Sequence, residues 1–349
     1  TESMKAPDKV KTSIGTLKYF DGLPEDNTCE TVYDYLDRSR AVNVYLNSIP
    51  ALSVNALREG QTRVGCGAAS NQICIWDTLM DSKTVLLTGN TSTMYAVGFL
   101  DLSKDGPTVI DLPPKMLGIL DDMAFKYMVD LGVAGPDKGK GGKFLVLPPG
   151  YKGEVPRGYF VVPSKTNGVW VFMRGYLDKG VKVASENIRN NLKVYPLSKA
   201  ANPPKMEWIN GTGKDFNTVH SASFKFFEEL HSVIDREPLE FLDPELRGLF
   251  ASIGIQKGMP FAPDERMTKI LTQAAKLGNA TVRALFWYER DQDEFLYEDS
   301  YWKRGMIGNS YEYIKDQGLG GRNLDARAQY FYMATFNSPA MVWKLIGKG

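Results

Sequence analysis

The adjacent carboxylates Asp121 and Asp122 are the residues of this sequence whose type and spacing best suit chemistry. Two neighbouring carboxylates repel each other, so burial of both would hold one of them protonated. A carboxyl that keeps its proton near neutral pH can act as a general acid on a glycosidic or amide bond. We therefore take Asp121 and Asp122 as candidate catalytic residues. The alternative is a solvated helix start, where the helix dipole favours aspartate.

A second polar stretch, Asn90-Thr-Ser-Thr-Met-Tyr95, offers groups suited to substrate binding. It presents an amide, hydroxyls and a phenol at the entry to a predicted strand, and such groups bind sugar hydroxyls or an oxyanion. The alternative is an Asx turn, in which these side chains satisfy their own backbone. The candidate substrate-binding residues of this stretch are Asn90, Thr91, Thr93 and Tyr95.

Arginine and aromatic side chains supply further candidates for substrate binding. Arg174 follows a predicted strand and could bind a carboxylate. Trp170, Trp76 and Tyr95 could provide stacking faces.

Other familiar motifs are incomplete. Gly135–Lys143 is rich in glycine and lysine, but no Ser or Thr follows a lysine at P-loop spacing, so a basic hairpin loop is predicted. There is no Gly-x-Ser-x-Gly elbow of a serine hydrolase. His220 and His231 are the only histidines, too few for a histidine-based zinc site. No metal site and no cofactor are predicted, although calcium bound by carboxylates stays open.

Charge, hydropathy and cysteine usage narrow the class of protein. The formal net charge of +1 argues against an electrostatic nucleic-acid binder, and no apolar run reaches the length of a membrane span. Three cysteines do not make a disulfide framework. Cys66 and Cys74 either pair across a loop or stay buried free thiols, and we favour the thiols.

The elements that must position these residues are short strands in the first half of the chain. The runs Thr108–Leu112, Lys143–Leu147 and Tyr159–Val162 each stop at proline, which removes a donor from the strand ladder. Val169–Met173 and Met94–Leu102 are further predicted strands. Short strands separated by frequent turns favour a sandwich or jelly roll.

Helical periodicity is also present. It predicts a helix from Thr28 to about Ser48, ended or kinked by Pro50, with a second short helix at Ala51–Glu59. The stretch Leu117–Val129 is either a helix or a bent strand, and its apolar spacing favours the helix. Later helices are predicted at Ser185–Val194, Ser221–Asp235, after the N-cap Asp243, and at Asp264–Leu277, ended by Gly278.

Aromatic runs at Phe286–Tyr288 and Ala328–Met333 predict that strands return near the C-terminus. Asn202-Pro-Pro marks a linker. We therefore predict three segments: an N-terminal β-sandwich module at 1–200, a helical linker at 201–285, and the incomplete start of a second β-sandwich module at 286–349.

Several phrases of the sequence resemble one bacterial family. They are Leu117-Gly-Ile-Leu-Asp-Asp, Gly135-Pro-Asp-Lys-Gly-Lys-Gly-Gly-Lys-Phe-Leu, Leu147-Pro-Pro-Gly-Tyr-Lys-Gly-Glu-Val-Pro, Gly254-Ile-Gln-Lys-Gly-Met-Pro-Phe and Ala334-Thr-Phe-Asn-Ser-Pro-Ala-Met. The family is described only as two domains of unknown function, numbered twelve-fifty-four and twelve-fourteen. The resemblance implies a mainly β protein of two jelly-roll-like domains joined by helices, with a fold similar to peptide-N-glycosidases. It also implies export, and a second module that normally runs on beyond Gly349.

These observations lead to three hypotheses about function. The first is an exported protein, periplasmic or secreted, that processes or binds a glycan or glycopeptide. The second is a non-catalytic binding or assembly protein, and the third a small-molecule hydrolase or lyase. An unpaired β edge in the shortened second module predicts a homo-oligomer or a companion chain.

Overall fold

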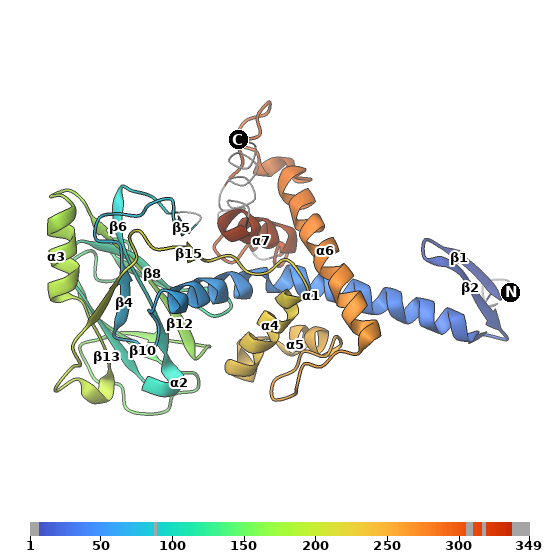
Figure 1. Ribbon diagram of the computed structural model, residues 1–349, viewed down its shortest axis with the longest axis horizontal. Coiled ribbons are helices and arrows are strands. Elements are labelled where there is room, and N and C mark those ends of the chain that lie inside the picture. Colours follow the sequence, from blue (N-terminus) through green and yellow to red (C-terminus); the bar gives the residue numbers. More distant parts are fainter. Residues whose placement is uncertain (1–6, 87–88, 305–309, 316–318, 337–349) are drawn as a thin grey trace.

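The computed structural model describes residues 7–86, 89–304, 310–315 and 319–336, apart from the side chains of Phe216, Asp293, Thr335 and Phe336. Two stacked β-sheets form one end of the molecule, and a helical body surrounds the long helix α1 beside them (Figure 1). At the other end of α1 lies a small three-stranded sheet of β1 Lys9–Thr12, β2 Gly15–Phe20 and β3 Leu23–Pro24.

The larger stacked sheet has six strands and the smaller has four, and most neighbouring strands in both are antiparallel. The large sheet consists, in spatial order, of β14 Glu207–Asn210, β4 Gln72–Ile75, β6 Thr93–Asp101, β12 Gly168–Tyr176, β8 Met116–Asp122 and β9 Tyr127–Gly132. The small sheet consists of β11 Phe160–Pro163, β10 Gly142–Leu147, β7 Thr108–Leu112 and β13 Lys193–Pro196.

Apolar side chains from both sheets meet in one buried core. Leu120 and Val171 of the large sheet belong to the same cluster as Ile110, Phe144 and Val146 of the small sheet. The prediction of stacked sheets in this half of the chain is therefore confirmed, and each predicted strand between 94 and 173 is present. A jelly roll and a mainly β protein are not confirmed, because long helices make up the rest of the fold.

The prediction of a helix over Leu117–Val129 is wrong. The stretch is the hairpin of β8 and β9, with a turn between Asp122 and Tyr127. Leu120 faces the core between the sheets, while Ile119 packs in a second cluster on the opposite face. Because both faces of this strand are covered, its apolar residues do not alternate with polar ones, and the pattern imitates a helix.

Helix α1 spans Asp26–Arg63 and continues through Pro50, so the predicted division into two helices is wrong. A proline inside a helix costs about 3 kcal/mol, since it removes a hydrogen bond and crowds the preceding turn. Here Ile49 and Leu52, on either side of the proline, are almost completely buried among the other helices. That burial outweighs the local cost.

The remaining helices pack around α1 or against the sheets. Asp243 caps α5 as predicted, with its Oδ1 accepting a hydrogen bond from the Leu246 amide at 2.8 Å. Gly278 does not end α6 but lies in its middle, where the ring of Tyr45 packs against it. The bounds are α2 Leu102–Asp105, α3 Val181–Asn191, α4 Lys225–Arg236, α5 Pro244–Ala251, α6 Glu265–Trp287 and α7 Leu324–Phe331. Shorter elements are β5 Thr84–Val85, β15 Phe216–Asn217, the 3₁₀ turns Leu197–Lys199, Leu239–Phe241 and Gln292–Glu294, and a π-helical turn Tyr332–Phe336.

The two strands predicted near the C-terminus are wrong. Phe286 and Trp287 end helix α6, and Ala328–Met333 runs from α7 into the π-helical turn. Ala328, Phe331 and Tyr332 are buried in the core of the helical body, which explains their apolar pattern. Within the described part of 286–336 only isolated bridges occur, so a second β-sandwich is not confirmed there. Residues 337–349 of the predicted module lie outside the described residues.

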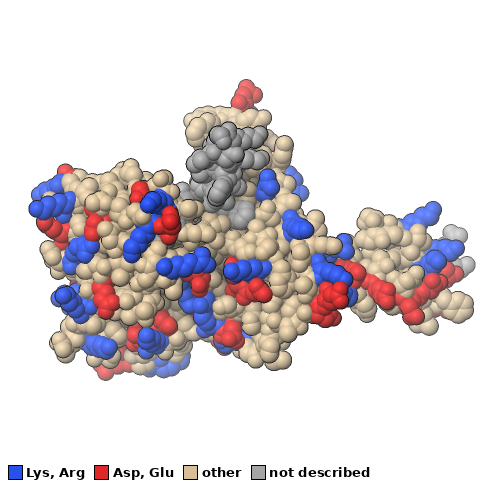
Figure 2. Space-filling view, in the orientation of Figure 1, with Lys and Arg blue, Asp and Glu red and all other residues tan. Residues whose placement is uncertain are grey.

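The division at 200, 201–285 and 286–349 stays a prediction. Strand β14 already lies beyond its first boundary and pairs in parallel with β4 of the large sheet. None of the described helices is both long and apolar enough to cross a membrane. On the face shown in Figure 2, positive and negative side chains are interspersed, as a net charge of +1 leads one to expect.

Candidate functional site

The outer face of the large sheet, turned away from the small sheet, lines a cavity of about 290 Å³. Strand β8 contributes Asp121 to it, and β12 contributes Trp170, Phe172 and Arg174. Successive residues of a strand point to opposite faces, so these alternate positions share one face. Aromatic residues from the segment around α7, among them Tyr313, Tyr330 and Phe331, line the cavity as well. We call it the Asp121 cavity.

Asp121 is a buried carboxyl without a hydrogen-bond partner among the described residues. Its exposed fraction is 6%. Burial, followed by the charges of Asp122 and Asp130, raises the pKa of Asp121 to about 7. Removal from water disfavours the charged form, and nearby like charges add to that effect. At neutral pH both the protonated and the ionised form of the Asp121 carboxyl are therefore populated, so the group can donate or accept a proton.

Two further cavity residues carry unused hydrogen-bond donors. Nε1 of Trp170 and Nε of Arg174 are buried, and neither has a partner within the described part of the chain. The indole of Trp170 stacks on Phe172 at a centroid distance of 4.8 Å. The guanidinium of Arg174 lies 5.1 Å from the centre of the Phe172 ring and 5.7 Å from that of Tyr95. The cavity thus combines flat aromatic surfaces with two buried N–H donors, on Trp170 and Arg174, that have no acceptor among the described residues.

Tyr313 and Tyr330 add phenols, and reasoning from the sequence did not find them. Burial is the largest cause of their raised pKa values, and the charge of Asp121 contributes to both. The two phenols therefore remain neutral hydrogen-bonding groups at physiological pH. No sequence signal connects them with Asp121, because about two hundred residues separate them and the stretch containing Tyr330 was predicted to be a strand.

Asp122 differs from its neighbour because it holds the β8–β9 turn. Its Oδ1 accepts hydrogen bonds from the amides of Ala124 at 2.8 Å and Lys126 at 2.9 Å. Burial raises the pKa of Asp122, and these two hydrogen bonds oppose the shift. Asp122 does not line the Asp121 cavity. The alternative of a solvated helix start is wrong for both aspartates, since both are buried at the end of a strand.

The Asn90 stretch forms the Asx turn that was the alternative to a binding site. Oδ1 of Asn90 accepts from the amides and hydroxyls of Ser92 and Thr93 at 2.9–3.2 Å. Its Nδ2 donates to the hydroxyl of Tyr95 at 2.9 Å. Thr91 is exposed on the turn. None of the four residues of this stretch lines the Asp121 cavity, although the ring of Tyr95 contacts the cavity residues Arg174 and Phe172. Their role in binding stays a prediction.

The structure therefore brings Asp121, Trp170 and Arg174 together, and leaves Asp122 and the Asn90 stretch outside. Trp76 is not a free stacking face, because it is buried and its Nε1 donates to Thr84 Oγ1 at 3.0 Å. Cys66 and Cys74 are buried free thiols, as favoured.

Neither histidine lies in the Asp121 cavity. Burial lowers the pKa of His220 to about 4, and its Nδ1 contacts the carbonyl of Ser221 at 2.9 Å. Nε2 of His231 contacts the carbonyl of Met259 at 2.8 Å. The described residues contain no group of three or more His, Cys, Asp or Glu placed to bind a metal ion.

The sheet region of the chain matches the model of one protein family, and the fold is similar to that of a solved structure. The model of the family described as "Protein of unknown function (DUF1254)" matches residues 70–196, which include most strands of both stacked sheets and also Asp121, Trp170 and Arg174. No curated protein matches the sequence. The crystal structure of the VPA0106 protein from Vibrio parahaemolyticus is similar, with a TM-score of 0.57 and 18% sequence identity over 86% of this chain and 68% of that chain. At that identity the likeness is one of fold.

Proposed function

We propose that the protein binds a sugar unit of a glycan or glycopeptide in the Asp121 cavity, and that Asp121 acts there as the general acid. The observation that carries this proposal is the Asp121 carboxyl itself, which is buried, lacks a hydrogen-bond partner among the described residues and has a pKa of about 7. A general acid works best when its pKa lies near the working pH.

The surroundings of Asp121 support a sugar as the ligand. A sugar ring has an apolar face of C–H groups and a rim of hydroxyls. The indole of Trp170 offers a flat surface for that face, and the unpaired Nε1 of Trp170 and Nε of Arg174 offer donors for the hydroxyl oxygens. Leaving such donors buried and unpaired costs about 1–3 kcal/mol each, a cost that a bound ligand removes.

In the proposed reaction Asp121 donates its proton to the leaving oxygen or nitrogen as the bond to the sugar breaks. Water adds to the sugar carbon and returns a proton to the carboxylate. The phenols of Tyr313 and Tyr330, both neutral, would hydrogen-bond to the substrate without changing charge. A small-molecule hydrolase or lyase would use the same acid, and only the size of the accepted substrate separates it from a glycan enzyme.

Binding without catalysis is the second candidate function. Glycoside hydrolases generally use two carboxylates that flank the bond. Among the described residues that line the cavity, Asp121 is the only one with a carboxylate. This observation favours a protein that recognises a glycan and does not cleave it.

The test is a panel of p-nitrophenyl glycosides and an N-linked glycopeptide, assayed with the wild-type chain and with Asp121→Asn. We expect one member of the panel to be turned over, with a loss of about 10²-fold or more in the variant, because Asn keeps the shape and lacks the proton. Binding of a panel member with no turnover selects the second candidate. If no member binds or reacts, both candidates are wrong.

A periplasmic or secreted location, and a homo-oligomer or companion chain, are part of the same proposal. The location rests on the resemblance seen in the sequence. The oligomer or companion chain was predicted from an unpaired β edge at Ala328–Met333, a stretch that is helical in the structure and so lends that prediction no support. Light scattering of the purified chain at high concentration tests the oligomer, and a clean monomer would count against it.

A further inference from the structure

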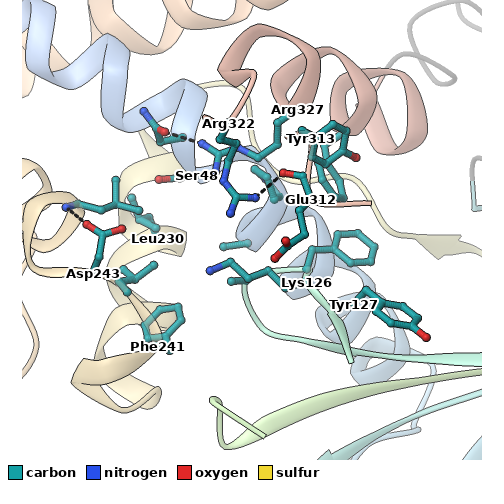
Figure 3. Close-up of a pocket in the computed structure, with 18 of the residues that line it drawn as sticks. Ser48, Lys126, Tyr127, Leu230, Phe241, Asp243, Glu312, Tyr313, Arg322 and Arg327 are labelled. Atoms are coloured by element: carbon teal, nitrogen blue, oxygen red, sulfur yellow. Dashed lines mark hydrogen bonds between the residues drawn. The ribbon is translucent and has the colours of Figure 1, made fainter. Parts of the chain in front are cut away.

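A second cavity, of about 130 Å³, lies beside the Asp121 cavity and has different chemistry (Figure 3). It forms where the β8–β9 turn, the middle of α1, the start of α5 and the segment that precedes and begins α7 meet. Phe125, Tyr313 and Phe331 line both cavities, so they form a shared wall. We call the second one the Arg322 cavity.

Three cationic side chains, Lys126, Arg322 and Arg327, line the Arg322 cavity (Figure 3). Arg327 donates from Nη2 to Asn47 Oδ1 at 2.6 Å, and its Nε is buried without a partner among the described residues. Arg322 donates from Nη1 to the backbone carbonyl of Glu312 at 2.7 Å. The ammonium group of Lys126 forms no hydrogen bond or ion pair within the described part of the chain. Several donors of all three residues therefore remain available.

The cavity does not neutralise these cations. Its lining contains two carboxylates, on Asp243 and Glu312. Asp243 already accepts the amide of Leu246 as the cap of α5. Among the described residues, neither carboxylate forms an ion pair with Lys126, Arg322 or Arg327. The lining thus has three positive groups against two negative ones.

Ser48 gives an independent indication that the cavity binds a hydrogen-bond acceptor. It lies on α1 two residues before Pro50 and lines the cavity, and its exposed fraction is 1%. Its hydroxyl has no hydrogen-bond partner among the described residues. A buried hydroxyl without a partner is rare in folded proteins and costs free energy. An acceptor bound in the cavity would satisfy it.

From this arrangement we propose that the Arg322 cavity binds a small oxyanion, a carboxylate or phosphate group, through Lys126, Arg322 and Arg327, with Ser48 donating a hydrogen bond. Guanidinium groups present paired N–H donors that match both kinds of anion. The small volume suits one such group and not an extended chain. This site does not depend on the proposed function of the Asp121 cavity.

The experiment is isothermal titration calorimetry of the full chain with inorganic phosphate and, separately, with succinate. We expect one or both to bind with a dissociation constant of about 10 mM or tighter. Lys126→Gln and Arg322→Gln should each weaken that binding by about tenfold or more, since each removes a charge-assisted contact. Ser48→Ala should weaken it by a smaller factor. Circular dichroism of each variant establishes that it is folded.

Lys152→Gln is the matched control, because Lys152 is exposed in the loop between β10 and β11 and lines neither cavity. It should bind like the wild type, as should Asp121→Asn, which separates this site from the proposed catalytic one. Sodium chloride at equal ionic strength should give no binding heat. The proposal is overturned if neither anion binds, or if folded Lys126→Gln and Arg322→Gln bind as tightly as Lys152→Gln.

Discussion

Asp121 and Trp170 face each other directly in the register of β8 and β12, and both side chains line the same cavity. Nε1 of Trp170 is buried without a hydrogen-bond partner among the described residues. Burial and neighbouring charges, and no hydrogen bond, account for the raised pKa of the Asp121 carboxyl. Burying two polar groups on adjacent strands without hydrogen bonds lowers the free energy of unfolding. This pairing is the basis of the proposed ligand site and leads to the first two predictions.

The stability of the protein should depend on pH through Asp121. Its pKa is raised from 3.8 to about 7 in the folded state, so its contribution to stability is fully present below pH 3.8 and is lost as the pH rises toward 7. The slope approaches about 1.4 kcal/mol per pH unit. Asp121→Asn, which cannot ionise, should gain stability relative to the wild type between pH 5 and pH 8. Urea unfolding at both pH values measures this, with the exposed Asp178→Asn as control. Parallel pH profiles for wild type and Asp121→Asn would show that Asp121 ionises normally.

Trp170→Phe should separate stacking from hydrogen bonding. Phenylalanine keeps an aromatic face but lacks the indole N–H, so affinity for the ligand of the Asp121 cavity should fall by about tenfold. Trp170→Ala should lose more, because it also removes the stacking surface. Calorimetry with the ligand identified in the glycan panel gives both values. Equal affinity for wild type and Trp170→Phe would mean that Nε1 does not contact the ligand.

Asp122→Ala should damage the fold and not the chemistry. The change removes the acceptor for two amides of the β8–β9 turn, and we expect a loss of about 1–3 kcal/mol in the free energy of unfolding. Asp122→Asn retains an oxygen at the same position and should lose less. At a temperature where all the proteins are folded, Asp122→Asn should keep ligand affinity. A selective loss of affinity without a loss of stability would return Asp122 to the list of candidate site residues.

Gly278→Ala should destabilise the protein, although alanine is the better helix former. A Cβ at this position would lie 2.5–3.0 Å from atoms of the Tyr45 side chain, and the crowding should cost about 1–3 kcal/mol. Gly248→Ala in α5 is the matched control, since a Cβ there meets nothing within 4 Å. That variant should gain up to about 1 kcal/mol. Thermal unfolding of both variants decides the question, and a gain in both would mean that Tyr45 moves aside freely.

Cys74 should resist alkylation in the folded protein. Its hydrogen bond with Cys66 and its burial raise the pKa of the Cys74 thiol, and the thiolate is the reactive form. Cys29 is only partly buried and should react with iodoacetamide about tenfold faster or more. Mass spectrometry of peptides from the treated protein measures each rate. Equal labelling of Cys74 and Cys29 would indicate that the outer face of the large sheet opens readily.

Part of this architecture follows from local sequence. Strands β7 and β10 end directly before Pro113 and Pro148, as the prolines predict. Asp243 caps α5, also as predicted. Both kinds of signal act within a few residues, so the local sequence is enough to read them. The sequence also identified Asp121, Trp170 and Arg174 as residues worth testing.

The remainder depends on contacts between distant parts of the chain. Only packing decides that α1 continues through Pro50, that 117–129 is a hairpin buried on both faces, and that Ala328 belongs to a helix. Tertiary structure also gives Asp121 and Asp122 different roles. The carboxyl of Asp121 lines a cavity, whereas that of Asp122 accepts hydrogen bonds from two backbone amides. The local sequence pattern shows which residues of an element are buried, but not which other elements cover them. The pKa of a side chain and its unused hydrogen-bonding groups depend on those covering elements.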